Sequence, residues 1–355
     1  TTLIRDLLTQ ASSTTAATTT ESFLSRVTDF HGASEQEISI AAQLSQLNDS
    51  FNTLSAAADD PVVLSGTLAQ AEQTAQSFND LGNLITKLRN DAQNDLTQAV
   101  NDVNDALERI AELNVKINAF SSSGKSIANY EDQRDQALKE VAERIDINYY
   151  RAENNQIVVL TKGGQTLADQ QAHPITFNPT PLGTSSSYGN GGAAPLLIEV
   201  SPTVPLVDIT HDALGGSIGA LIELRDETLI RYQAQTDELA QKTARRFADQ
   251  GLELFTDADG NVPANVAPPG AVDYTGFASI MQVNQDIRDD ITLLRSGTNG
   301  ETVQAGSTEV IDRVIEFAFG QFQYEQGIGT LDISAGTIFA AAGLQQESQV
   351  VGTAD

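Results

Sequence analysis

Apolar residues recur every three or four positions along most of residues 1–145, the spacing that places them on one face of an α-helix. A short amphipathic run over 3–8 opens the chain. Residues 12–20 are Ser, Thr and Ala, and because β-branched Thr is a poor helix former we expect a loop or weak helix there. Ser34 and Glu37 then form a capping box, which predicts a helix ending near Asp59.

The next segment carries the longest apolar stripe. Asp60 is a suitable N-cap and Pro61 suits the first helical position, so we predict one helix from Pro61 to about Phe120, roughly 90 Å long. The steps alternate between three and four, as in a coiled coil, with a stutter of successive fours, and Gly82 is a weak point. The stripe comprises Phe78, Leu81, Ile85, Leu88, Ala92, Leu96, Val100, Val103, Leu107, Ile110, Leu113, Ile117 and Phe120.

A Ser/Gly turn at 121–124 ends this helix. A second helix follows from about Tyr130 to Arg144, with Asn129 as its expected N-cap. The two helices should form an antiparallel hairpin. A helix this long is typical of rods and filaments, and it favours an elongated shape.

Composition changes near Asp146, where short β-branched or aromatic runs alternate with turn residues. We predict strands over 147–150, 156–161, 174–177, 196–200 and 207–210. The chain becomes helical again from about Gly219 to Glu253. A β-rich segment entered and left by helices is an insertion into a helical rod.

The sequence therefore predicts an α+β fold, an elongated, coiled-coil-like bundle of long helices with an inserted small β domain and a mixed C-terminal region. Helices are also expected from about Ser307 to Glu325 and from Ser334 to Gln349. The predicted domains are the first part of the rod at 1–145, the β insert at 146–212, the return helix at 213–255, a loop-rich region at 256–306 and the last part of the rod at 307–355.

Composition narrows the possible functions. The chain has 20 Lys and Arg against 48 Asp and Glu, and the net charge of −28 disfavours binding to nucleic acid or anionic membranes. It contains no Cys, which excludes disulfides, thiol nucleophiles and Cys-based zinc sites. No apolar run approaches the roughly 20 residues that span a bilayer.

Motifs that suggest chemistry are incomplete. Residues 121–126 resemble a phosphate-binding loop, but Ala119 replaces its first glycine and a helix precedes it, so a plain interhelical turn is favoured. Asp257 and Asp259 begin like a calcium loop, yet Pro268 occupies the twelfth position, where a glutamate is needed. A turn is the favoured interpretation there, and weak surface binding of Ca²⁺ stays open.

The three histidines, His31, His173 and His211, are scattered without metal-binding spacing. A pair of carboxylates acting as in a hydrolase stays open because acidic residues are abundant, but no pair stands out. We therefore predict no catalytic residues, no cofactor-binding residues and no metal site, and a protein that is not an enzyme.

Two stretches resemble a known family. Residues 129–138 (NYEDQRDQAL), preceded by 110–114 (IAELN), resemble the "IA-x-LN … D-x-RDQ-x-L" region of flagellar hook-associated protein 1. Residues 215–229 (GGSIGALIELRDETL), followed by Tyr232 and 237–240 (DELA), resemble the glycine-rich helix of the same family. Thr236 departs from the family, which usually has Leu there. The resemblance covers roughly residues 35–255.

The resemblance implies a structural protein of the bacterial flagellum at the hook-filament junction. Such a protein is exported through the flagellar secretion channel and assembles outside the cell as a ring of copies on the hook, which it adapts to the filament during assembly of the motility organelle. The implied partners are further copies, the hook protein, hook-associated protein 3 and an export chaperone that binds the C-terminal segment. Neither terminus here resembles the family's terminal segments, so we expect a trimmed core that is monomeric alone.

The resemblance also suggests assembly residues. These are the polar positions around Arg134, Asp135, Arg225 and Asp226, whose alternative role is to form ion pairs within one subunit. Two alternative functions remain: another flagellar axial protein, either a flagellin or hook-associated protein 3, and a secreted enzyme or adhesin built on a helical rod.

Overall fold

The computed structural model divides the chain into two compact units. The first unit comprises Thr1–Ser25, Leu88–Leu182 and Gly191–Thr228, and the second comprises Arg26–Lys87, Gly183–Asn190 and Leu229–Asp355. The structure describes residues 2–31, 39–122, 126–152, 155–200, 204–212, 214–264, 274–300 and 303–320.

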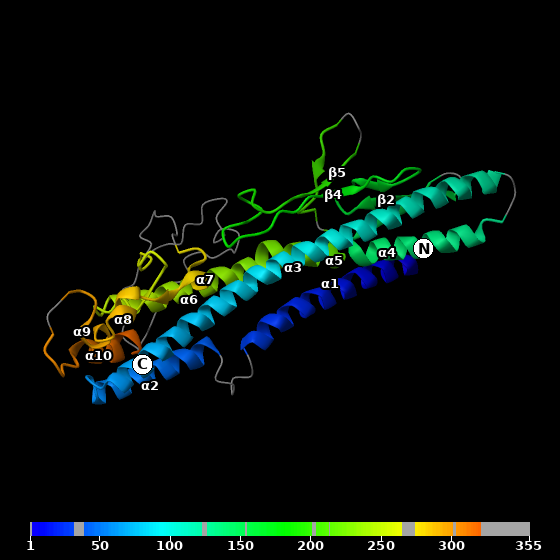
Figure 1. Ribbon diagram of the computed structural model, residues 1–355. Helices are drawn as coiled ribbons and strands as arrows, with labels where there is room; N and C mark the ends of the chain where they lie inside the picture. Colours follow the sequence, from blue (N-terminus) through cyan, green and yellow to red (C-terminus); the bar gives the residue numbers. More distant parts are fainter. Residues whose placement is uncertain are drawn as a thin grey trace. The chain divides into compact units, whose positions relative to one another are not determined.

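The predicted long helix is present as α3 (Pro61–Ser122), which contributes to both units (Figure 1). It begins as expected, because the Val62 N–H donates to Asp60 Oδ1 at 2.8 Å. At 1.5 Å per residue, its 62 residues span about 93 Å. The predicted stripe is buried from Phe78 to Ile117.

The loop or weak helix predicted over 12–20 is wrong, because α1 (Thr2–His31) is a single helix through this stretch. Tertiary packing overrides the low helix propensity of threonine. The hydroxyls of Thr15 and Thr18 donate to carbonyls one turn earlier, which satisfies them within the helix. Leu8 and Phe23 are also buried, so tertiary packing stabilises the helix.

The next helix, α2 (Ile40–Ala56), has Ser39 as its N-cap, with the Ala42 N–H donating to Ser39 Oγ at 3.1 Å. The predicted capping box at Ser34 and Glu37 lies outside the described residues. The helix ends at Ala56, slightly before the predicted end near Asp59.

In the first unit, α3 and α4 (Ala128–Arg144) form the predicted antiparallel hairpin. As residue numbers rise on α3 they fall on α4 in four successive contacts, which fixes the direction. The contacts are Asp102 with Arg144, Arg109 with Glu140, Asn114 with Arg134, and Phe120 stacked on Tyr130. The N-cap predicted at Asn129 is wrong, since α4 begins at Ala128 and its N-cap position makes no side-chain hydrogen bond.

Two antiparallel sheets follow in the first unit, in the stretch where short strands were predicted. The first has the order β1 (Ile147–Arg151), β2 (Ile157–Thr161) and β3 (Thr166–Ala168). The second has the order β4 (Ile175–Phe177), β5 (Leu196–Ile198) and β6 (Val207–Asp208). The five predicted strands are present, and β3 was missed because its three residues form too short a run.

The return helix starts earlier than predicted and contains a π-helical turn. It consists of α5 (Gly216–Glu223), the π turn η2 (Leu224–Thr228) and α6 (Leu229–Ala248). At its start, Gly215 and Gly216 have φ angles of 55° and 56°. A Cβ on Gly216 would lie 2.5 Å from the Arg144 carbonyl carbon, so glycine is required where α5 meets the end of α4.

In the second unit, the predicted loop-rich region contains short elements. These are β7 (Phe255–Thr256), α7 (Phe277–Ile280), β8 (Gln282–Val283), α8 (Gln285–Asp289) and α9 (Leu293–Ser296), followed by α10 (Glu309–Arg313) and the π turn η3 (Val314–Ala318). The last two account for the helix predicted from Ser307. The helix predicted over Ser334–Gln349 lies outside the described residues. The α+β class, with long helices and small antiparallel sheets, is confirmed.

Candidate functional site

Three asparagines on α3 bind backbone groups of residues 157–182 in the first unit, a stretch that contains β2, β3 and β4. Each amide donates to the carbonyl of one apolar residue and accepts from the N–H of the same residue, as a neighbouring strand would. We call Asn90, Asn104 and Asn114 the asparagine ladder. The pairs are Asn90 with Leu182, Asn104 with Ile175 and Asn114 with Ile157, with N···O distances from 2.8 to 3.1 Å.

The ladder satisfies backbone groups that packing removes from water. The side chains of Leu182, Ile175 and Ile157 are all at least 96% buried. A buried backbone N–H or C=O without a partner costs about 1–3 kcal/mol. The ladder therefore fixes the register of residues 157–182 along α3.

Arg134 of α4 joins the ladder at Asn114. Its Nη1 donates to Asn114 Oδ1 at 3.0 Å and to the Asn155 carbonyl at 2.8 Å. The side chain is fully buried, and burial lowers the pKa of Arg134 from its usual value. Glu131 is 3.8 Å from the guanidinium, so oxygens of neutral groups make its close contacts. Two residues from separate sequence motifs thus form one cluster, which we call the Asn114–Arg134 clasp.

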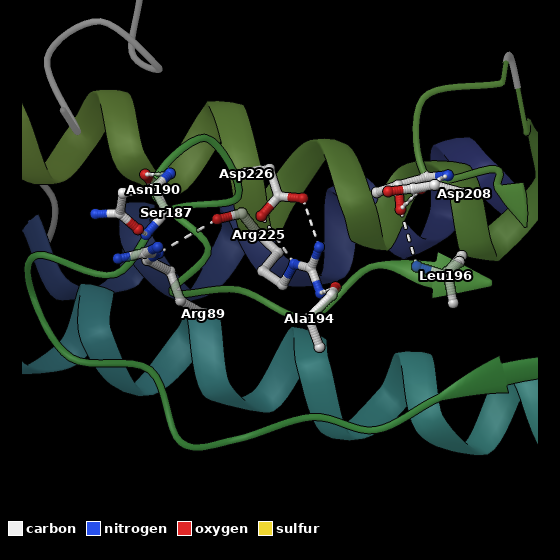
Figure 2. Close-up of polar contacts among 9 residues, drawn as sticks. Arg89, Ser187, Asn190, Ala194, Leu196, Asp208, Arg225 and Asp226 are labelled. Atoms are coloured by element: carbon white, nitrogen blue, oxygen red, sulfur yellow. Dashed lines mark hydrogen bonds and ion pairs between the residues drawn. The ribbon is translucent and has the colours of Figure 1, made fainter. Parts of the chain in front are cut away.

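A second buried arginine lies on the π turn η2 (Figure 2). Arg225 makes a bidentate ion pair with the adjacent Asp226, with N···O distances of 2.8 and 2.6 Å, and its Nη1 donates to the Ala194 carbonyl at 3.0 Å. Arg89 of α3 donates to the Arg225 carbonyl at 3.2 Å, and burial lowers the pKa of Arg89 to about 10. Leu224, Arg225 and Asp226, three consecutive residues of this π turn, are all buried.

These positions change the assignment of assembly residues. Arg134 and Arg225 are fully buried and Asp226 is 4% exposed, so none of them presents a surface to another subunit. The alternative role, ion pairs within one subunit, describes Arg225 and Asp226, whereas Arg134 makes its hydrogen bonds to neutral oxygens of the same chain. Asp135 differs because its side chain is exposed.

The second unit contains a comparable arrangement around α7. Asp237 of α6 is 1% exposed, and its carboxylate accepts from the N–H groups of Gly276 at 2.7 Å and Ala278 at 3.0 Å. Asn79 of α3 donates to the carbonyls of Ala278 at 2.8 Å and Met281 at 3.0 Å. We call this the Asn79–Asp237 clasp.

Two further features belong to this clasp. Burial raises the pKa of Asp237 to about 7, against hydrogen bonds from Gly276, Ala278 and Gln233 that favour the carboxylate. Gly82 leaves room for α7, because a Cβ there would lie 2.4 Å from Ser279 Oγ. The predicted weak point of the long helix is thus the place where α7 approaches it.

The incomplete chemical motifs can now be placed. Asp257 Oδ1 accepts from the N–H groups of Asp259 and Asn261 at 2.9 and 2.8 Å, which is the geometry of the predicted turn. Within the described ranges, no group of three or more His, Asp or Glu is arranged to hold a metal ion. In the phosphate-loop-like stretch, α3 ends at Ser122 and residues 123–125 lie outside the described ranges.

Sequence reasoning missed the asparagine ladder. Asparagine is a poor helix former, so its recurrence in a long helix was an available signal. The partners lie 43 to 92 residues away, and no periodicity within the helix identifies them.

Taken as a class, this is a helical scaffold whose buried polar side chains hold strands and short helices against long helices. Residues 24–264 match the family model described as the flagellar hook-associated protein FlgK helical domain, and the chain belongs to that family. The resemblance drawn from the two sequence motifs is confirmed.

A solved structure has the same fold. It is the flagellar hook junction protein FlgK from Burkholderia pseudomallei, with a TM-score of 0.61 and 22% sequence identity. The match covers 75% of this chain and 47% of that chain, so this chain spans about half of that protein's length. No curated protein matches the chain.

Proposed function

We propose that this chain is the helical core of a hook-filament junction protein, a structural component of the bacterial flagellum that assembles as a ring on the hook and adapts it to the filament. The observation that carries the proposal is the match of residues 24–264 to the helical domain of the hook-associated family. The fold shared with the Burkholderia pseudomallei hook junction protein adds support.

The physical character of the chain agrees with this role. The buried asparagines, arginines and Asp237 bind the chain's own backbone, which suits a part that must hold its shape in an assembly. The absence of Cys suits export as an unfolded chain to an extracellular destination. None of the described helices is long and apolar enough to cross a membrane.

The proposed partners are further copies of the protein, the hook protein, hook-associated protein 3 and an export chaperone. We expect the chain alone to be monomeric in dilute solution, which sedimentation would measure. We also propose that the protein has no enzymatic activity. Hydrolysis of peptides or glycans by the purified chain would revive the alternative of a secreted enzyme.

The proposal is tested by immunogold electron microscopy of flagella that carry the intact protein with a small tag. Label confined to the boundary between hook and filament is expected. Removal of the protein should leave hooks without filaments. Label along the whole filament would indicate a flagellin instead, and absence of label from flagella would contradict the proposal.

A further inference from the structure

Two adjoining hollows in the second unit form one groove between α2 and α6. The first, of about 460 Å³, has Leu81 and Ile85 of α3 and Tyr232 and Leu239 of α6 among its lining residues. The second, of about 310 Å³, continues toward Phe247 and Phe319. The hollows share Ala41 and Leu44 of α2, so we treat them as a single groove, the α2–α6 groove.

The larger hollow is apolar and open to solvent. None of the residues that line the larger hollow is charged, although the chain as a whole is 19% charged. Leu239 is 45% exposed and Tyr232 is 37% exposed, which is unusual for large apolar side chains on one face of one helix. From Tyr232 to Phe247 the groove follows α6 for about 22 Å, the length of about four helical turns.

One helix of the chain has a surface that matches this groove. In α1, no charged side chain occurs between Asp6 and Glu21. Leu8 and Ser12 face inward, whereas Leu7 is 60% exposed and Thr14, Ala17 and Thr18 are also exposed. We call these four exposed residues the uncharged face of α1.

The threonine hydroxyls of this face already form hydrogen bonds within α1, which lowers the cost of burying them. Thr18 Oγ1 donates to the Thr14 carbonyl at 3.1 Å, and Thr14 Oγ1 accepts from the Gln10 amide at 3.1 Å. Burying a hydroxyl that is already hydrogen bonded costs much less than burying a free one. The uncharged stretch from Leu7 to Thr20 is about 20 Å long, close to the length of the groove.

We propose that the uncharged face of α1 of one copy occupies the α2–α6 groove of a second copy. The uncharged face of α1 and the larger hollow carry no charge, and Arg246 adds one positive charge to the smaller hollow, so this pairing brings no acidic groups together in a chain of net charge −28. The contact is heterologous, because face and groove are different surfaces, and heterologous contacts build rings or filaments. The inference rests on the proposed function and names the surfaces through which copies meet.

The absence of natural cysteine makes the contact directly testable by cross-linking. Thr14→Cys and Leu239→Cys each place one thiol on an exposed position of the two surfaces. The purified single-cysteine chains are mixed at high concentration with a short bis-maleimide. Val62→Cys, at a position 79% exposed outside both surfaces, replaces Thr14→Cys in the matched control.

We expect the Thr14→Cys and Leu239→Cys mixture to form cross-linked pairs about tenfold faster than the control mixture, because docking raises the effective concentration of the two thiols. Ala17→Glu in the Thr14→Cys chain should abolish this difference while circular dichroism shows unchanged helix content. Equal rates in the test and control mixtures would overturn the proposal.

The intact protein in flagella separates this inference from the proposed function. With both cysteines in one chain, a head-to-tail contact gives a ladder of cross-linked multimers, whereas an isologous contact stops at dimers. Immunogold label at the junction without a ladder would overturn the contact and leave the proposed function standing. Label absent from the junction would overturn both.

Discussion

In the first unit, Asn114 and Arg134 hold the backbone at the start of β2, and in the second unit Asn79 and Asp237 hold both ends of α7. Each clasp combines an asparagine of α3 with a buried charged residue from another helix. The charges are opposite, because the arginine donates to carbonyl groups while the aspartate accepts from N–H groups.

This difference has a physical consequence. A guanidinium stays charged at all accessible pH values, so the Asn114–Arg134 clasp should hold equally well across the pH range. A buried carboxylate can take up a proton, and burial raises the pKa of Asp237 to about 7. The second clasp should therefore respond to pH and the first should not.

The largest expected effect comes from Asn114→Ala. The change removes an acceptor of Arg134 and leaves both backbone groups of Ile157 unpaired, so we expect a loss of about 3–5 kcal/mol in the free energy of unfolding.

Asn79→Ala removes the donor to the carbonyls of Ala278 and Met281 and should lower the free energy of unfolding by about 1–3 kcal/mol. Urea unfolding measures both.

Asn101→Ala is the control for these two variants, because Asn101 is an exposed residue of the same helix. It should change stability by less than about 0.5 kcal/mol. Alanine is the better helix former at both positions, so equal losses for Asn101→Ala and Asn114→Ala would show that the effect does not depend on the hydrogen bonds of the clasp.

The second prediction concerns the pH dependence of stability, which should differ between the two clasps. The pKa of Asp237 is raised in the folded state from 3.8 to about 7, so the folded protein binds this proton more tightly than the unfolded chain. Its contribution to stability is full below about pH 4 and is lost as the pH rises to about 7. Wild type should gain about 2–3 kcal/mol relative to Asp237→Asn between pH 7.5 and pH 5.

Unfolding of the two proteins at several pH values above the sequence pI of about 4.2 measures this gain. The difference between wild type and Arg134→Met should stay constant over the same range. A constant difference between wild type and Asp237→Asn as well would contradict the titration of Asp237.

A third prediction uses two glycines of α3. Gly66→Ala meets nothing within 4 Å and should stabilise the helix by about 0.5–1 kcal/mol. Gly82→Ala places a Cβ 2.4 Å from Ser279 Oγ and 3.1 Å from its backbone nitrogen, so we expect a loss of about 1–2 kcal/mol. Thermal unfolding compares the pair, and stabilisation by both changes would show that α7 does not depend on close contact at Gly82.

The smallest effect is expected at a surface contact of the α3–α4 hairpin. Arg109 forms an ion pair with Glu140, and the Arg109 side chain is 51% exposed. The hydrogen bond from Arg109 lowers the pKa of Glu140, but solvent screening limits the gain. Glu140→Gln should cost less than about 1 kcal/mol, and a loss as large as that of Asn114→Ala would show that the hairpin depends on its surface charges.

The elements predicted correctly are those with strong local signals. The apolar stripe of α3 follows the helical period over many turns, and Asp60 with Pro61 marks its start by local capping. The five strands of the β insert were found because turn residues separate them. The assembly role predicted for Arg134 and Arg225 came from family resemblance, which carries no information about burial.

The misses have non-local causes. The threonine-rich part of α1 is helical because Leu8 and Phe23 pack against other elements, which propensity cannot show. The π turn at Leu224–Thr228 places Arg225 and Asp226 together, and no spacing rule predicts it. The asparagine ladder depends on backbone partners 43 to 92 residues away in the sequence. Each miss therefore lies where tertiary contacts, and not the local pattern, decide the structure.

The central claim is that Asn114, Arg134, Arg225 and Asp226, the buried polar residues of the two family motifs, form contacts within the chain. A double-mutant cycle of Asn114→Ala and Arg134→Met, followed by urea unfolding, tests it most directly. The account predicts a coupling energy above about 1 kcal/mol, because each residue binds the other inside one subunit. Additive effects with little loss of stability would contradict the account and return these residues to a role in contacts between subunits.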